Sequence, residues 1–288
     1  MSLSGFLLVL TAAFCHAGWN YLVKRVNGGP ELIWLFSLVS TVLYLPAAVF
    51  IVSTQQPYIG PAQATFIAGS VLLHLGYFLL LQQGYRKGDL SLVYPTARAT
   101  GPLLSTTMAV LFLGEVLSWQ IAAGGVAVIT GILFLTGGFD RRARHVLASL
   151  VFGLAAGVLI GSYTVWDAYA VTALAVPPLL LDYASNVGRT LILAPYAVTR
   201  KQRIRAQWTD HRGAVVAIAA LNPLAYILVL YALTFTPVVY VAPTRELSVL
   251  LSVLLGALLL REGQFVRRLG WAALILAGIV LLVTDGAL

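Results

Sequence analysis

The chain repeats itself at an interval of 147 residues. Three residue types that seldom match by chance follow this register, because Trp19, Arg98 and Glu115 recur as Trp166, Arg245 and Glu262. Leucine and glycine match at further positions, but both are so common in this sequence that they add little. Duplicated hydrophobic halves are a recurrent architecture of membrane transporters. We therefore predict that each half of the chain is one structural unit made twice.

The composition places this repeat in a membrane. Hydrophobic residues make up 60% of the chain and charged residues 10%, and the mean hydropathy is +0.91, outside the range of soluble domains. A hydrocarbon core of about 30 Å needs about 20 helical residues to cross it. Ten such runs occur: Leu3–Val23, Leu32–Ser53, Ala62–Gln83, Leu90–Leu113, Trp119–Gly137, Val146–Tyr169, Pro177–Thr199, Gly213–Phe235, Val238–Leu260 and Val266–Thr284.

The predicted fold is an all-α membrane protein with ten transmembrane helices as two inverted five-helix repeats. The first repeat covers residues 1–140 and the second residues 146–288. An odd number of spans per repeat makes the second repeat enter the membrane upside down relative to the first. Such a pair places a substrate site near the middle of the membrane and permits alternating access.

The basic residues between the spans predict the orientation. Lys and Arg fall in alternate loops, as at Lys24 and Arg25, Arg86 and Lys87, and residues 200–212. By the positive-inside rule these loops are cytoplasmic, so both termini are predicted on the outer side. The net charge of +8 is then a topology signal and a contact surface for membrane lipid. Nucleic acid is not an expected partner.

Arg98 and Arg245 occupy corresponding positions within the fourth and ninth predicted spans, where a charge costs about 2.5 to 3.5 kcal/mol on insertion scales. Arg98 lies near the cytoplasmic end of the fourth span, and Arg245 lies near the outer end of the ninth. One interpretation is that each guanidinium extends to the nearer membrane interface or pairs with a helix end. The other is that the two arginines lie at opposite entrances of a cavity and bind a substrate carboxylate in turn. Glu246 points away from Arg245 and is expected to pair with another helix.

A polar and aromatic face recurs on the first and sixth spans. His16, Trp19 and Asn20 correspond under the repeat to Tyr163, Trp166 and Asp167. We predict that this face contacts the substrate, because aromatic anchors at a membrane interface need no polar companions. Interface anchoring stays open as the alternative. His16 is either a proton-coupling group or a hydrogen-bonded packing residue.

Further polar side chains lie on four other spans. Asp182, Asn186 and Arg189 share one face of the seventh span, as an ion pair that locks helices together or as a stripe that lines a cavity. Tyrosines suit a mostly neutral solute with few polar groups. The residues expected to complete an aromatic cavity are His74, Tyr77, Tyr94, Asn222 and Tyr226.

Prolines predict bending points in the fourth and ninth spans. Pro95 and Pro102 interrupt the fourth span, while Pro237 opens the ninth and Pro243 lies in its first turns. Because proline removes a backbone hydrogen bond, these positions are candidates for gating. The single cysteine, Cys15, lacks the neighbours of a metal site. No cofactor or metal is expected.

These features resemble the EamA-type branch of the drug/metabolite transporter superfamily. The resemblance rests on ten spans, on two repeats of this length, and on the acidic residue that closes the fourth and ninth spans in Phe112-Leu113-Gly114-Glu115 and Leu259-Leu260-Arg261-Glu262. It covers essentially the whole chain, although Arg261 stands where a glycine is usual. The sequence is most similar to the aromatic and neutral amino-acid exporters of bacterial inner membranes, of the YddG type. The resemblance implies a central cavity lined by both halves, and export down a gradient or in exchange for protons.

The predicted function is export of amino acids and related small metabolites across a bacterial inner membrane by alternating access, with the monomer as the working unit. The substrate side chain is expected against Trp19 and Trp166, with its carboxylate near an arginine. A carrier of nucleotide sugars or phosphate esters remains open, because arginines lie at membrane depth. A broad drug exporter is a further alternative, although the first span lacks the acidic residue of four-span multidrug antiporters.

Two functional classes other than transport are disfavoured by the sequence. An enzyme is not expected, because the motifs HExxH, GxSxG and GxGD are absent from the sequence. A membrane scaffold subunit would not need polar residues that recur under the inverted symmetry. Transport by this chain is therefore the leading hypothesis.

Overall fold

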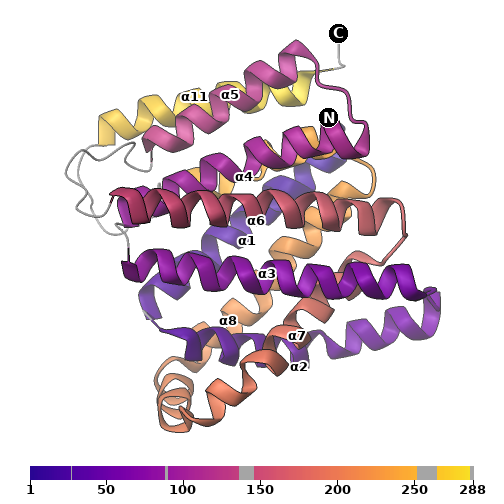
Figure 1. Ribbon diagram of the computed structural model, residues 1–288, viewed down its shortest axis with the longest axis vertical. Helices are drawn as coiled ribbons and strands as arrows, with labels where there is room; N and C mark the ends of the chain where they lie inside the picture. Colours follow the sequence, from indigo (N-terminus) through magenta and orange to yellow (C-terminus); the bar gives the residue numbers. More distant parts are fainter. Residues whose placement is uncertain (27, 88–89, 136–145, 252–264, 286–288) are drawn as a thin grey trace.

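The fold is a bundle of helices, shown as a computed structural model in Figure 1. It describes residues 1–26, 28–87, 90–135, 146–251 and 265–285. The helices are α1 (Leu3–Val26), α2 (Pro30–Gln55), α3 (Pro61–Lys87), α4 (Leu90–Leu113), α5 (Trp119–Leu135), α6 (Val146–Thr172), α7 (Pro178–Val198), α8 (Lys201–Leu233), α9 (Val238–Thr244) and α11 (Phe265–Thr284). The all-α membrane fold of two inverted repeats is confirmed.

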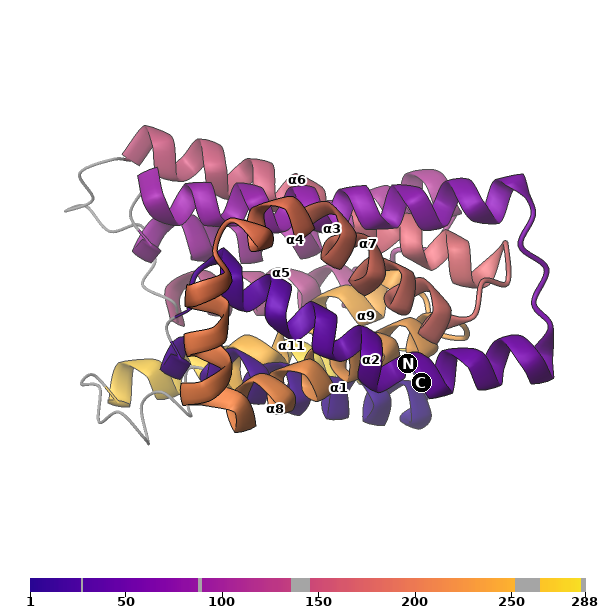
Figure 2. The ribbon, with the colours of Figure 1, turned by 90° about the horizontal axis from the view of Figure 1, so that it is seen from below.

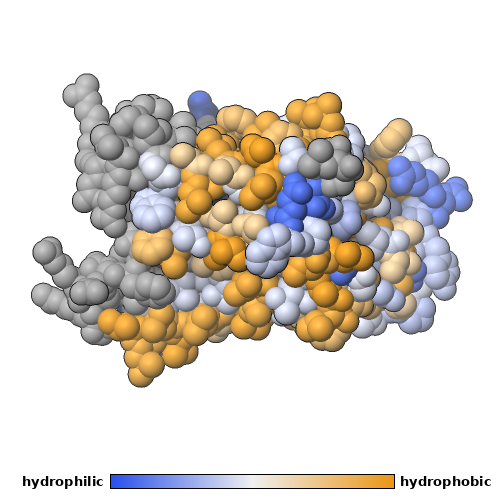
Figure 3. All heavy atoms as spheres, turned by 90° about the horizontal axis from the view of Figure 1, so that it is seen from above, coloured by the Kyte–Doolittle hydropathy of each residue, from blue (hydrophilic) through white to orange (hydrophobic). Residues whose placement is uncertain are grey.

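The surface of the bundle is suited to lipid. Among the described helices, five are long and apolar enough to cross a membrane, namely α1, α2, α3, α6 and α8. Large apolar side chains point outward, including Phe112 at 71% and Trp119 at 87% exposure. Figure 3 shows such side chains spread over much of one face. A soluble protein rarely exposes so many large apolar side chains, whereas a bilayer solvates them.

The two repeats pack as an inverted pair. Shifting α1, α2 and α3 by 147 residues gives 150–173, 177–202 and 208–234, which coincide with α6, α7 and α8 to within several residues. The contacts follow the same symmetry, because α3 packs on α6 as α8 packs on α1, while α2 packs on α7 and α5 on α11. In Figure 1, α1 leads away from the end that holds the N-terminus and α6 leads toward it.

The N-terminus and the end of α11 lie together at one end of the bundle. The ammonium group of Met1 is 3.3 Å from the carbonyl oxygen of Val283, and Figure 1 shows the N-terminus on the same side as the last turn of α11. The last turn of α3, with Arg86 and Lys87, lies at the opposite end. This separation of termini and basic residues matches the predicted loop pattern; which end faces the cytoplasm stays a prediction.

Two predicted boundaries are wrong. The basic segment 200–212 is not a loop, because α8 begins at Lys201 and bends at His211, where φ is −134° and ψ is 23°; Figure 2 shows the first turns running across the rest of the helix. The predicted span Val238–Leu260 is not continuous either. It breaks at Arg245 and Glu246, which form a turn before the chain is helical again at 247–251.

Glycines bring helices of opposite repeats close together. On α6, a Cβ at Gly153 would lie 2.9 Å from the Val93 carbonyl oxygen of α4. On α11, a Cβ at Gly278 would lie 2.7 Å from the carbonyl oxygen of Gly124 on α5. Small residues at such crossings let backbones approach, which is how helices gain packing energy in lipid.

The acidic residue after α4 caps α9. Both carboxylate oxygens of Glu115 accept backbone hydrogen bonds, from Val238 at 2.8 Å and Val239 at 2.9 Å. A carboxylate at this position also meets the positive end of the helix dipole. Gly114 makes the required reversal with φ of +69°, a conformation that glycine adopts without strain. The family-like motif of the first repeat therefore joins the two repeats. Its second copy, Leu259 to Glu262, lies outside the described residues.

The α5–α11 crossing predicts a stability effect. Gly278→Ala should lower the free energy of unfolding by about 1 to 3 kcal/mol, because the added methyl meets backbone. Thermal unfolding in detergent measures it. Gly125→Ala, on the same helix pair, is the matched control, since a Cβ there meets nothing within 4 Å. Equal melting temperatures for the two variants would contradict the close approach.

The cap predicts a second effect. Glu115→Ala should destabilise the protein by about 1 kcal/mol, as loss of a helix cap does, and Glu115→Gln by less, because its amide oxygen still accepts a bond. Thermal unfolding of the three proteins in one detergent gives the order. A Glu115→Ala protein as stable as the wild type would show that the cap contributes nothing.

Candidate functional site

A cavity of about 80 Å³ lies inside the bundle, between the two repeats. Side chains from α1, α3, α4, α6, α7 and α8 line it, together with the break that follows α9. Its polar and aromatic lining is formed by His16, His74, Tyr77, Phe78, Arg98, Tyr163, Asp182, Ser185, Arg189, Asn222, Tyr226 and Arg245. This is the central location expected of a substrate site in an inverted-repeat protein.

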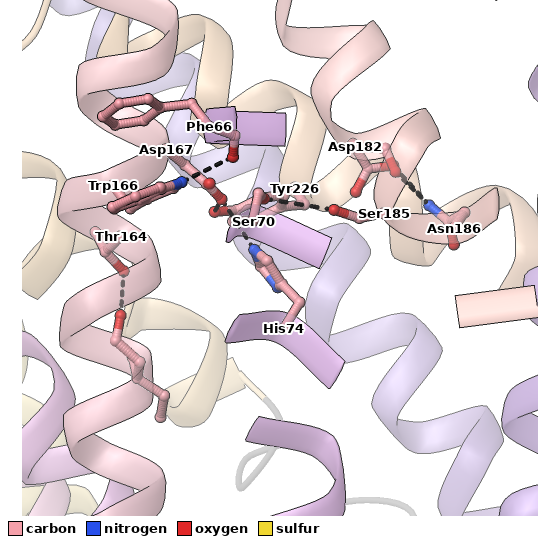
Figure 4. A network of polar contacts seen from close by, with 11 residues as sticks. Phe66, Ser70, His74, Thr164, Trp166, Asp167, Asp182, Ser185, Asn186 and Tyr226 are labelled. Atoms are coloured by element: carbon pink, nitrogen blue, oxygen red, sulfur yellow. Dashed lines mark hydrogen bonds and ion pairs between the residues drawn. The ribbon is translucent and has the colours of Figure 1, made fainter. Parts of the chain in front are cut away.

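Asp167 anchors a hydrogen-bonded group beside the cavity, shown in Figure 4. Its side chain is fully buried on α6. Oxygen Oδ2 accepts the hydroxyl hydrogen bond of Tyr226 at 2.5 Å and lies 2.9 Å from Nε2 of His74. The imidazole stacks on Tyr163 with ring centroids 4.0 Å apart. Helices α3, α6 and α8 are thus tied together by one carboxylate.

Arg98 is paired across the repeats. Its guanidinium contacts Oε1 of Glu246 at 3.3 Å, donates to Oγ of Ser248 at 3.2 Å, and lies 3.4 Å from Nε2 of His16. Glu246 is fully buried. The expectation that Glu246 pairs with another helix is met by α4. Arg98 therefore forms an ion pair with the other repeat, and its guanidinium also lines the cavity.

Arg245 differs from its repeat counterpart. Within the described part of the chain its guanidinium has neither a hydrogen bond nor an ion pair; it lies over the ring of Tyr163 at 5.9 Å. The residue lines the cavity and is 9% exposed. The neighbouring Glu246 does not pair with Arg245, because its carboxylate contacts Arg98.

The polar stripe on α7 also reaches the cavity. Asp182 and Arg189 both line it, and the amide of Asn186 donates to Oδ2 of Asp182 at 2.9 Å. The Arg189 guanidinium lies 4.6 Å from the ring centroid of Phe78, and its NH1 has no hydrogen-bond partner among the described residues. No ion pair joins Asp182 to Arg189 there. Two of the three stripe residues therefore line the cavity, whereas Asn186 does not; a role of the stripe in substrate contact stays a prediction.

Six of the predicted substrate-contact residues do not line the cavity, namely Trp19, Asn20, Tyr94, Trp166, Asp167 and Asn186. Trp166 packs between α6 and α3, since its indole donates to the carbonyl oxygen of Phe66 at 2.7 Å and stacks on that ring at 4.1 Å. Trp19 donates to Nδ1 of His16 at 3.3 Å. Asn20 and Tyr94 are partly buried away from the lining. Their contact with substrate stays a prediction.

The predicted gating prolines lie in three settings. Pro95 and Pro102 are inside α4. Pro237 is the N-cap of α9, and Pro243 lies inside that helix just before its break. The position of Pro243 suits a bending point, and gating itself stays a prediction.

Sequence reasoning missed Phe78 and Ser185. Ser185 is three residues after Asp182, so the helical spacing of the stripe was a usable signal. Its hydroxyl lies 3.4 Å from that of Ser70 on α3. Phe78 gave no such signal, because its sequence neighbourhood does not distinguish a cavity-lining aromatic residue from a lipid-facing or core one. Only the contact with Arg189 in the structure identifies its position.

A polar cavity enclosed by two inverted helical repeats defines the class of membrane transporters for small metabolites. The EamA-like transporter family matches residues 3–137 and again 147–284. The chain therefore belongs to the EamA-like transporter family, whose members are transporters rather than enzymes.

Comparison with solved structures supports the same fold. The crystal structure of one other protein resembles this chain with a TM-score of 0.74 at 17% identity, covering 97% of this chain and 98% of the other. No curated protein matches the sequence. The shared fold does not specify a substrate.

Proposed function

We propose that this protein exports amino acids and related small metabolites across a bacterial inner membrane. One observation carries the proposal: the cavity combines Arg245, whose guanidinium has neither a hydrogen bond nor an ion pair among the described residues, with a carboxylate, Asp182, among aromatic rings. These are the three groups that a zwitterion with an apolar side chain requires. The family match supports transport of small metabolites, and the amino-acid substrate is the further step that we propose.

The electrostatics of the cavity suit a zwitterion. Six charged groups lie in or directly behind the lining: Arg98, Arg189, Arg245, Asp167, Asp182 and Glu246. Their formal charges cancel when the histidines are neutral. A buried cation without a partner costs several kcal/mol, and a substrate carboxylate offsets this cost at Arg245 by charge-assisted hydrogen bonds. The substrate ammonium group is assigned to Asp182.

Aromatic rings supply the apolar part of the site. Tyr77, Phe78 and Tyr163 line the cavity between the two charged ends. Their faces bind apolar side chains without a fixed hydrogen-bond pattern. This arrangement favours aromatic and neutral amino acids over strongly polar ones.

The transport cycle in this proposal is alternating access between the repeats. The inverted packing provides two related arrangements of the same helices, and the break after α9 is the point at which the second repeat bends. The basic end of the bundle faces the cytoplasm and both termini face outward, by the positive-inside rule. Export as the direction follows from the resemblance to amino-acid exporters, and the monomer is the working unit.

A second candidate is a carrier of anionic metabolites, such as nucleotide sugars or phosphate esters. It is favoured by the convergence of Arg98, Arg189 and Arg245 on one cavity. Against it, Arg98 is already paired with Glu246. That pair leaves fewer cations for a phosphate.

Counterflow in liposomes separates the two candidates. Purified protein is reconstituted, loaded with an unlabelled compound, and supplied with labelled phenylalanine, threonine, methionine, a nucleotide sugar or a cationic dye at equal pH on both sides. Exchange of amino acids supports the proposal. Exchange of the nucleotide sugar or the dye alone overturns it and leaves the fold unaffected.

Arg245→Gln should raise the half-saturation concentration for an exchanged amino acid about 10- to 100-fold, because a charge-assisted hydrogen bond contributes about 1.5 to 3 kcal/mol. Arg86→Gln is the control, because Arg86 is an exposed arginine in the last turn of α3 and should transport like the wild type. Size-exclusion chromatography checks folding. An unchanged half-saturation concentration in Arg245→Gln would remove that residue from the site.

A further inference from the structure

The hydrogen bonds of Asp167 leave its charge incompletely compensated. Both contacts converge on Oδ2, while Oδ1 is buried and has no partner among the described residues. The hydroxyl of Tyr226 is neutral. A buried carboxylate is stable only when it is protonated or paired with a positive charge. In direct contact, only the imidazole of His74 can supply that charge.

We propose that His74 and Asp167 together form a proton-binding site, which releases its proton when the substrate ammonium group binds at Asp182 of the same cavity. With the proton bound, the pair is an imidazolium and a carboxylate, and its net charge is zero. When the proton leaves to cavity water, a neutral imidazole and a carboxylate remain, with a net charge of −1. That charge attracts the ammonium group of the substrate, so export is coupled to proton entry. This inference rests on the proposed amino-acid substrate for its coupling step only.

The position of His74 makes the proton exchangeable. Asp167 is sealed behind the lining at 0% exposure, but the His74 side chain is 11% exposed and lines the cavity. Water in the cavity therefore reaches the imidazole and not the carboxylate. His74 carries the proton in and out, and Asp167 stabilises the charged imidazole, as a carboxylate partner does for histidine in proton transfer.

The site occurs once in the molecule. The repeat counterparts of Asp167, His74 and Tyr226 are Asn20, Leu221 and Leu79, none of which ionises. The two arrangements of an alternating cycle therefore share a single titrating pair. One proton per transport cycle follows from this count.

Other ionisable groups lie around the same cavity. Arg98 is compensated by Glu246, whereas Arg245 and Asp182 are the groups that the proposed substrate would engage. The ionisable groups that face the pair from the surrounding elements are His16 on α1, Tyr77 on α3, Arg98 on α4, Tyr163 on α6, Asp182 and Arg189 on α7, Tyr226 on α8, and Arg245 and Glu246 after α9.

Proton coupling is tested in the same liposomes with an imposed pH gradient. The wild type should accumulate a labelled amino acid beyond the level reached at equal pH. His74→Gln and Asp167→Asn should lose this extra accumulation, and whatever exchange remains should no longer depend on pH. His211→Gln, an exposed histidine at the bend of α8, is the control that keeps the wild-type response.

His16→Gln separates the two cavity histidines. It should retain the response to the pH gradient, because His16 contacts the paired Arg98 and no carboxylate. Loss of the response in His16→Gln alone would overturn the proposal. So would full gradient-driven accumulation in both His74→Gln and Asp167→Asn, or a wild type that exchanges amino acids and ignores the gradient.

A substrate-free measurement keeps the proton site separate from the proposed substrate. Infrared difference spectra of histidine-labelled protein in detergent, recorded between roughly pH 5 and 8, should contain an imidazole band that His74→Gln removes and Asp167→Asn shifts. Bands unchanged in both variants would overturn the proton site. A wild type that shows the band but exchanges no amino acid would refute the substrate class and leave the proton site standing.

Discussion

In the low dielectric interior of this bundle a buried charge without a partner is costly, and the pairing of Arg98 with Glu246 offsets that cost across the two repeats. The carboxylate belongs to one repeat and the guanidinium to the other, at 3.3 Å. Removing one member of a buried pair leaves the other uncompensated, at a cost of about 3 to 5 kcal/mol. Arg245 and Glu246 are adjacent, and the backbone at Arg245 is close to helical, with φ of −56° and ψ of −24°. Neighbouring side chains on such a backbone point about 100° apart, so Glu246 meets Arg98 while Arg245 lines the cavity.

The helices follow the two-fold repeat, whereas the charged groups around the cavity do not. Helix positions and the arginines Arg98 and Arg245 follow the repeat, as an alternating mechanism requires. The acids beside the cavity do not, because Ala99 stands at the position equivalent to Glu246, and Asn20 at that of Asp167. Arg98 is consequently paired with Glu246, while Arg245 has no ion pair among the described residues. Duplication thus supplied two related conformations, while later divergence supplied the polarity of the cavity.

The sequence predicted the fold well because its strongest signals are long-range averages. Hydropathy over about 20 residues and a fixed repeat interval tolerate local errors, so the helices lie close to their predicted bounds. The break after α9 was missed because Pro243 is compatible with a continuous kinked helix. The helical start of α8 was missed because a run of Lys and Arg is equally typical of a loop.

The site was predicted less completely, and the two tryptophans show why. Trp19 and Trp166 share a polar helix face with cavity residues, but helical spacing does not distinguish a side chain that faces the cavity from one that turns toward a neighbouring helix. Gly69 decides the matter for Trp166, since any larger residue on α3 would collide with the indole: a Cβ there would lie 2.5 Å away. The tyrosines were predicted better, because a buried hydroxyl needs a partner, and Asp167 provides one for Tyr226. The polar residues of a cavity can therefore be inferred from sequence, because buried polar groups need hydrogen-bond partners. The apolar residues of its lining cannot, because they depend on how the helices pack.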